Sequence, residues 1–309
     1  MHSHPDTDVR KKPIKNLNAA KHYEIEDNGD SRTFVVTGPW GSKSESALLK
    51  SGADTLILNY ARGFQEPTLD FLDSWPIRHF ELLSRTTSDI TPIYRLSGTL
   101  ETLALTDGSR TSLDYSRFSH LKLLAVAMSA SSLASIQELT QLEVLALGGY
   151  TESDFTPLCT LLELRQIYFT GRPRLESLRG VERFTKLRDL TIAGASRLTD
   201  ISALSDIRSP LIELDLQGCK NFSFVPPLDN LTELKLLNLG NIGEIESFRP
   251  LAGLSNLESL RVYESTRPVD NDLSPLLGLR KLTHLGIQHR RAYSPTAVKI
   301  KEALGLPPR

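Results

Sequence analysis

The chain has 309 residues and an almost even charge balance, with 36 Lys and Arg against 37 Asp and Glu. This balance argues against a dedicated nucleic-acid binder or a binder of anionic membranes, because both normally carry a basic excess. The two cysteines exclude a disulfide-rich scaffold and a multi-cysteine zinc site. Leucine dominates the apolar residues, with 53 in all and only three in the first 50 residues, which indicates a repeated packing unit.

The N-terminal segment is polar and contains Arg10, Lys11, Lys12 and Lys15. This composition predicts a disordered tail over residues 1–21. Because no apolar stretch follows Met1, we expect no secretory signal peptide and a cytoplasmic protein.

Residues 22–52 are expected to form an N-terminal cap. Tyr23 and Ile25 alternate with polar residues before Asn28-Gly29, and an Asn-Gly pair favours the tight turn of a β-hairpin. A short helix is predicted over residues 44–50, with Gly52 after its end. A solenoid needs such a cap because its first strand would otherwise expose an unpaired edge.

The loop at residues 37–44 resembles a phosphate-binding loop, because it joins a predicted strand to a predicted helix and ends in Lys43-Ser44. That motif needs glycine at two positions so that backbone N–H groups can wrap a phosphate. Here these positions hold Thr37 and Ser42. We therefore expect a capping turn, and a nucleotide-binding enzyme or regulator remains an alternative function from another class.

A pattern of apolar-x-x-apolar-x-apolar recurs about every 23 residues through most of the chain. Its last three positions alternate as a β-strand does. One short strand per repeat cannot bury its inner face alone, so successive repeats must stack into a parallel sheet with a shared core. Eleven segments fit the pattern, and they begin at Ala53, Ile77, Leu100, Leu121, Leu142, Leu164, Leu187, Leu211, Leu234, Leu257 and Leu282.

The segments between the strands carry apolar residues three apart, as at Phe155, Leu158, Leu161 and Leu164. A step of three fits a 3₁₀ turn or coil better than an α-helix. The outer layer should therefore be thin, and we expect moderate curvature.

These repeats resemble the leucine-rich repeat family, and residues 198–204 and 248–257 resemble its short, internalin-like bacterial class. The resemblance covers residues 53–290. It implies an α/β-type solenoid with about eleven parallel strands on a concave face, 3₁₀ or coil return segments and a cap at each end.

The chain departs from the family pattern after each strand. The family places Asn, or sometimes Cys, three residues beyond the last strand leucine, where the side chain bonds neighbouring turns. Only Cys219 fits among the corresponding residues, which are Ala61, Arg85, Gly108, Ser129, Tyr150, Arg172, Ala195, Cys219, Ile242, Ser265 and Arg290.

Residues 291–309 are expected to form a C-terminal capping helix and tail. Ser294 is the predicted N-cap, and Gly305 follows the helix as the residue that ends it. Ala297, Ile300 and Leu304 share one face of this helix and are expected to cover the last repeat.

Residues between the inward strand positions should point onto the concave surface. They predict a small apolar zone in the third to fifth repeats, an acidic zone in the seventh and eighth, and a basic zone in the last two. A contiguous apolar patch of this kind usually marks an interface. The predicted partner-binding residues are Leu123, Ala125, Val144, Ala146, Tyr168, Asp189, Glu213, Asp215, Asn238, Arg261, Tyr263 and His284.

We therefore expect a non-enzymatic scaffold that binds a protein partner on its concave sheet. It should be a monomer that needs no cofactor and binds neither nucleic acid nor membrane. An immunity-type or regulatory inhibitor that occludes an enzyme is the alternative of the same kind. No metal site is expected, because His284 and His289 bracket the last strand without a third converging ligand.

Overall fold

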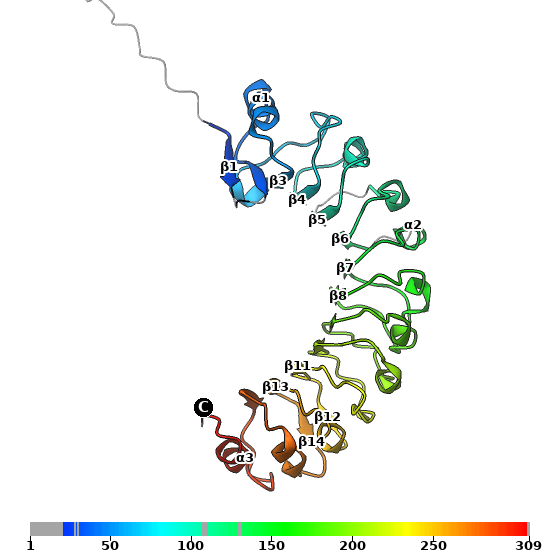
Figure 1. The fold of residues 1–309 in the computed structure, drawn as a ribbon, viewed down its shortest axis with the longest axis vertical. Helices are drawn as coiled ribbons and strands as arrows, with labels where there is room; N and C mark the ends of the chain where they lie inside the picture. The colour runs from blue at the N-terminus through cyan, green and yellow to red at the C-terminus, as the bar shows by residue number, and fades with distance from the viewer. Residues whose placement is uncertain (1–20, 28, 30, 107–110, 129–131, 308–309) are drawn as a thin grey trace, which may run out of the picture.

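The computed structural model describes residues 21–27, 29, 31–106, 111–128 and 132–307. The predicted tail lies outside these residues, apart from Lys21. The described chain winds into an arc, with the strands along its inner side and short helical turns along its outer side (Figure 1).

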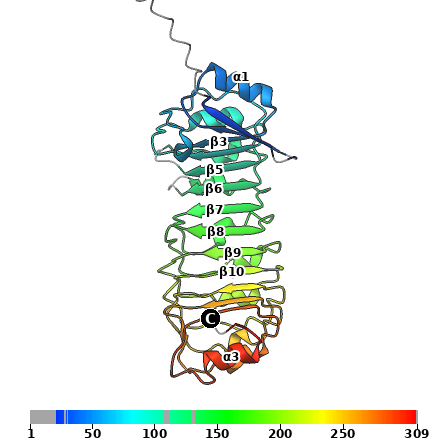
Figure 2. The same cartoon turned by 90° about the vertical axis from the view of Figure 1, so that its left-hand side faces the viewer.

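Within the described residues, thirteen strands form one sheet, and from the second strand onward each pairs in parallel with the next (Figure 2). Leu190 pairs with Leu214, and Leu214 pairs with Leu237, so equivalent residues of neighbouring repeats lie side by side. The eleven predicted strands are confirmed as β3 (Thr55–Asn59), β4 (His79–Leu83), β5 (Thr102–Thr106), β6 (Leu123–Ala127), β7 (Val144–Gly148), β8 (Gln166–Thr170), β9 (Asp189–Ile192), β10 (Glu213–Asp215), β11 (Leu236–Asn238), β13 (Ser259–Val262) and β15 (His284–Ile287).

The predicted N-terminal hairpin extends the sheet itself. Strands β1 (Tyr23–Asp27) and β2 (Arg32–Val36) are antiparallel, and β2 pairs in parallel with β3. Helix α1 (Ser42–Ser51) follows and ends at Gly52, whose φ of 66° is the left-handed conformation that glycine adopts without steric cost.

Where the structure describes them, the return segments form 3₁₀ turns as predicted, with one short α-helix among them and two strands that pair as a small second sheet. The helical segments are η1 (Tyr60–Arg62), η2 (Thr91–Leu96), η3 (Tyr115–Arg117), α2 (Ser132–Ile136), η4 (Thr156–Leu158), η5 (Val181–Arg183), η6 (Ser202–Asp206), η7 (Arg249–Leu251) and η8 (Ser274–Gly278). The small sheet pairs β12 (Glu244–Ile245) with β14 (Arg267–Pro268).

The arc curves more strongly than we expected, because both of its ends turn toward the open side (Figure 1). Buried aromatic rings occupy part of the outer layer. The rings of Phe155 and Phe184, from consecutive return segments, meet edge to face with their centroids 6.1 Å apart, whereas neighbouring strands lie only about 4.8 Å apart.

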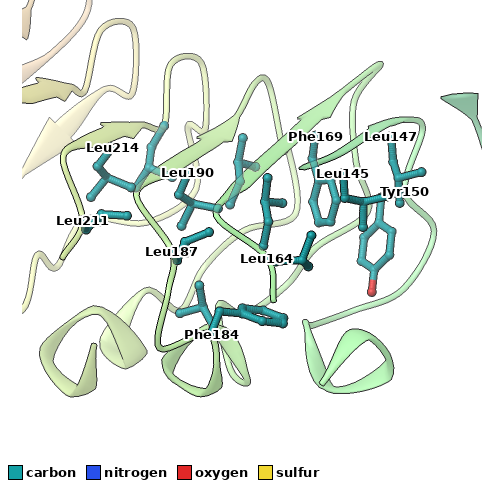
Figure 3. Packing of buried hydrophobic residues seen from close by; sticks show 14 of the residues in the cluster. Leu145, Leu147, Tyr150, Leu164, Phe169, Phe184, Leu187, Leu190, Leu211 and Leu214 are labelled. Atoms are coloured by element: carbon teal, nitrogen blue, oxygen red, sulfur yellow. The ribbon is translucent and has the colours of Figure 1, made fainter. Parts of the chain in front are cut away.

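The core lies between the sheet and the return segments and runs the length of the arc. Strand residues such as Leu145, Leu190 and Leu214 are fully buried, and Figure 3 shows their side chains directed from the strands toward the return segments. Tyr150 stacks on Phe169 at a centroid distance of 4.4 Å. The repeats are therefore joined by continuous apolar packing.

Cysteine and threonine bond neighbouring turns where the family uses asparagine. The Cys219 thiol donates to the carbonyl oxygen of Ile192 at 3.3 Å. Thr266 lies one residue beyond the aligned position; its hydroxyl donates to the carbonyl of Leu239 at 2.5 Å and accepts the N–H of Ile242 at 3.1 Å. Each of these two hydrogen bonds to a carbonyl joins residues 27 positions apart and takes the place of the asparagine bond at that turn.

Helix α3 (Ala297–Ala303) forms the C-terminal cap. The prediction of Ser294 as its N-cap is wrong, because the Thr296 hydroxyl accepts the N–H of Lys299 instead. The backbone N–H of Ser294 donates to Asn271 at 3.0 Å and so extends the contact between neighbouring turns. Gly305 ends the helix as predicted, with a φ of 68° and a hydrogen bond to Glu302.

Candidate protein-binding surface

The concave face presents the predicted binding residues in adjacent columns across the sheet. One column runs from Leu123 through Val144, Asp189 and Glu213 to His284. The strand register places the other predicted residues beside it, in a second column of Ala125, Ala146, Tyr168, Asp215, Asn238 and Arg261, while Tyr263 follows the end of β13.

Four small or aliphatic side chains form what we call the apolar trough: Leu123, Ala125, Val144 and Ala146. Leu123 pairs with Val144 and Ala125 with Ala146 across β6 and β7, and all four are half-buried. The trough lies on the face that Figure 2 turns toward the reader. The two alanines leave this part of the sheet surface low, and Tyr168 rises beside it on β8.

Tyr168 borders the apolar trough on the C-terminal side, because it pairs with Ala146 in the register. Its side chain is half-buried. Burial raises the pKa of the Tyr168 hydroxyl, and the nearby carboxylates of Asp189 and Glu213 raise it further. Tyr168 therefore stays a neutral donor that faces the acidic zone at physiological pH.

The acidic zone is organised by internal amides. The side-chain amide of Gln166 donates to Asp189 at 2.5 Å, and the amide of Asn238 donates to Asp215 at 2.8 Å. Glu213 is exposed. The carboxylates of Asp189 and Asp215 are thus held in defined directions, and each keeps lone pairs free to accept further hydrogen bonds.

Asn238 does not present an exposed side chain, contrary to its expected place among the binding residues. Only 1% of its surface is exposed. Its amide donates to Asp215, and its side-chain oxygen accepts the N–H of Gly240 at 3.0 Å. A residue at a concave strand position is buried here because its own polar neighbours surround it.

The ring of Tyr263 lies against two glycines of the sheet, which the sequence pattern did not reveal. A Cβ atom on Gly240 would lie 2.6 Å from the ring atom Cζ, and one on Gly286 would lie 3.5 Å from Cδ1. The absence of a side chain at Gly240 is therefore required for the ring position. Arg261 is half-buried and His284 is exposed beside this ring.

A search of solved structures finds leucine-rich repeat proteins. An internalin from Listeria monocytogenes is 20% identical, aligns over 84% of this chain and 83% of its own, and superposes with a TM-score of 0.51. The fold is a leucine-rich repeat solenoid.

Two further leucine-rich repeat structures are similar at lower scores. Internalin C2 from Listeria monocytogenes is 24% identical over 58% of this chain and 78% of its own, with a TM-score of 0.44. A leucine-rich repeat protein from Leptospira interrogans is 15% identical over 82% of this chain and 70% of its own, with a TM-score of 0.41. No family model and no curated protein matches the sequence.

The loop at residues 37–44 packs as part of the N-terminal cap of the leucine-rich repeat. The indole of Trp40 stacks on Phe71 at a centroid distance of 4.4 Å. The backbone N–H of Trp40 donates to the carboxylate of Glu66 at 2.8 Å. A carboxylate bound to this loop disfavours a phosphate at the same place, because the two anions would repel each other.

The described residues contain no group of three or more His, Cys, Asp or Glu side chains that could hold a metal ion. The described part of the chain also has no helix long and apolar enough to cross a bilayer. Both cysteines are free thiols, and burial raises the pKa of Cys219 to about 11. Cys219 is therefore a protonated structural side chain at neutral pH.

Proposed function

We propose that this leucine-rich repeat protein is a non-enzymatic, cytoplasmic scaffold that binds a protein partner on its concave face. The apolar trough of Leu123, Ala125, Val144 and Ala146 is the observation that carries this proposal. Its four side chains are contiguous across two paired strands and remain partly exposed. Contiguous apolar surface that is open to solvent usually serves an interface.

The rest of the concave face supports the same function. Strand residues on a packed sheet need little ordering when they bind, so less conformational entropy is lost than for a loop surface. Tyr168 and Tyr263 lie on either side of the acidic zone, and tyrosine is frequent among residues that dominate binding energy. Charged residues on both sides, such as Glu213 and Arg261, would orient the partner and speed its association.

An inhibitor that occludes an enzyme would use this same surface. In that case the partner is an enzyme whose activity falls when the complex forms. The partner's activity, measured with and without the scaffold, therefore separates these two forms of the proposal.

The proposal is tested by affinity capture from the native host with matched variants. Ala125→Arg places a long charged side chain in the apolar trough, and Ala252→Arg makes the same change at an exposed return-segment position. The wild type and Ala252→Arg should retain the same protein partner, and Ala125→Arg should lose it. If Ala252→Arg lost the partner and Ala125→Arg kept it, the concave face would not be the binding surface.

A further inference from the structure

The last strand of the solenoid has a free edge. Within the described residues β15 pairs with β13 alone, and Gly286 lies opposite Arg261. In β13 the carbonyl oxygen of Arg261 accepts the N–H of Leu239 at 2.8 Å, so Arg261 directs its backbone groups toward the preceding strand. Gly286 is the equivalent residue of β15 and directs its backbone groups toward β13. Because alternate residues of a parallel strand direct their backbone groups to alternate sides, Leu285 and Ile287 direct theirs toward the free edge.

The C-terminal cap covers the outer part of the last repeat and leaves this strand edge open. Helix α3 packs against the return segment η8, beyond the last strand at the end of the arc (Figure 1). Leu285 and Ile287 are 5% and 8% exposed, whereas the mid-stack Leu190 and Leu214 are 0% exposed. The inward residues of the terminal strand are thus slightly more exposed than those in the middle of the stack.

A pocket of about 420 Å³ runs along this edge. Six consecutive residues of the strand segment, 283–288, line one side, and Lys301, Leu306 and Pro307 of the cap line the other. The pocket is mainly apolar in its walls, and the unpaired backbone groups of β15 face it. These are the features that a sheet edge needs to accept one further strand.

Lys301 gives the pocket its charge preference. Its side chain is only 7% exposed, and among the described residues it has neither a hydrogen-bond partner nor an ion-pair partner. Its ammonium nitrogen is not one of the buried polar atoms that lack a partner, so the group reaches solvent in the pocket, where an incoming carboxylate would complement its charge. Glu264 also lines the pocket, but it is exposed and does not pair with Lys301.

We propose that the β15 edge binds an extended segment of a protein partner as an additional β-strand, with an acidic side chain of that segment beside Lys301. Backbone hydrogen bonds to Leu285 and Ile287 would supply the pairing, and the apolar pocket walls would take an aliphatic side chain from the neighbouring position. The carboxylate then selects acidic segments over basic ones.

This site does not depend on the concave-face proposal. Six strand steps separate β7 from β15, which corresponds to about 29 Å along the sheet. Tyr263 and His284 border both surfaces, but the apolar trough does not reach the pocket. Ala125→Arg should therefore leave binding at the β15 edge unchanged, so that the two proposals succeed or fail separately.

The test uses an array of acetylated and amidated seven-residue peptides with β-branched residues at alternate positions and Asp, Glu, Asn or Lys at the centre. The intact protein should bind acidic-centred peptides preferentially, and Lys301→Met should weaken that binding by roughly two- to fivefold. Lys299→Met, on the exposed side of the same helix, is the matched control and should change nothing. Equal binding of Asp-centred and Lys-centred peptides, or no binding to any of them, would overturn the proposal.

Hydrogen exchange gives an independent reading of strand addition. The amides of Leu285 and Ile287 should exchange quickly in the free protein and become protected when an acidic-centred peptide is bound, whereas Leu190 in mid-stack should be protected throughout. Peptide binding without new protection at Leu285 and Ile287 would contradict strand addition. A Lys301-dependent dimer in sedimentation experiments would assign the edge to a second copy of the chain and would also overturn the proposal.

Discussion

The side-chain amide of Asn238 donates a hydrogen bond of 2.8 Å to the carboxylate of Asp215 on the neighbouring strand. The oxygen of the same amide accepts the N–H of Gly240 at 3.0 Å. Asn238 therefore joins two repeats through polar contacts on the concave side, while the leucines join them through apolar contacts on the other side. The acidic zone is held in place by the protein before any partner binds.

Asn238→Ala should destabilise the protein although the residue lies at a concave strand position. The change removes both hydrogen bonds and leaves the buried N–H of Gly240 unpaired, which should lower the free energy of unfolding by about 1–3 kcal/mol. Glu213→Ala is the control, because Glu213 is exposed on the neighbouring strand. Urea unfolding of the two variants measures the difference, and equal stabilities would show that the Asn238 network contributes nothing.

Leu190→Ala should cost about 2–5 kcal/mol, because it opens a cavity in the mid-stack core. The neighbouring Asp189→Ala should cost much less, since Asp189 is half-buried on the concave side and the bond that the change removes is the one from the Gln166 amide to its carboxylate. Leu237→Ala repeats the test two repeats further along. If urea unfolding found Asp189→Ala as damaging as Leu190→Ala, the assignment of inward and concave strand positions would be contradicted.

Tyr168→Ala and Tyr263→Ala should each weaken partner binding by about 2 kcal/mol if these rings anchor the complex. The Tyr263 ring already packs against Gly240 and Gly286, so it loses little freedom on binding. Lys281→Ala, at an exposed residue that bonds Asn256 near the start of the last repeat, should have no effect on affinity. Calorimetry with the captured partner provides the measurement, and unchanged affinity in both tyrosine variants would remove them from the interface.

Asp154 should make stability depend on pH. Burial alone would raise the pKa of its carboxyl, but hydrogen bonds from the N–H of Thr156 and from Arg179 hold the pKa below its ordinary value of 3.8. A lowered folded-state pKa means that the stabilisation is complete above the ordinary value and is lost as the pH falls through the folded value.

Asp154→Asn should therefore reduce the free energy of unfolding by about 1–2 kcal/mol near neutral pH. The difference between wild type and variant should shrink as the pH is lowered below about 4. Denaturant unfolding of both proteins between neutral and acidic pH measures this difference in the free energy of unfolding. The contributions of the other carboxylates cancel in the difference, because both proteins contain them. A difference that grew on acidification would show that the carboxyl is protonated in the folded protein.

Lys43→Ala should leave stability within about 0.5 kcal/mol, as is usual for an exposed position. Calorimetry should also detect no binding of ATP or GTP in the micromolar range, because the adjoining loop already binds the carboxylate of Glu66. Micromolar nucleotide binding that disappeared in Lys43→Ala would support the nucleotide-dependent alternative and contradict the scaffold proposal.

Repeat periodicity was sufficient to predict the fold. Because the strand pattern returns about every 23 residues, Leu190, Leu214 and Leu237 had to occupy equivalent inward positions in neighbouring repeats, and the register confirms that they pair in sequence. The residues between them then had to face the concave side, so the columns that contain Ala125 and Ala146 were also predictable. Local helix endings were predictable where a single glycine decides them, as at Gly52 and Gly305.

Contacts between repeats determine the features that the repeat pattern does not predict, such as the burial of individual polar side chains. Asn238 is buried among the neighbours that its amide contacts, such as Asp215 and Gly240, and the Tyr263 ring occupies space that a side chain at Gly240 would fill. Lys301 lies on a helix face that no repeat pattern describes, and its burial depends on how α3 meets the last repeat. The spacing of the apolar residues along the sequence determines which of them are buried. Whether a polar group is buried or exposed depends instead on which neighbours the completed stack brings within hydrogen-bonding distance.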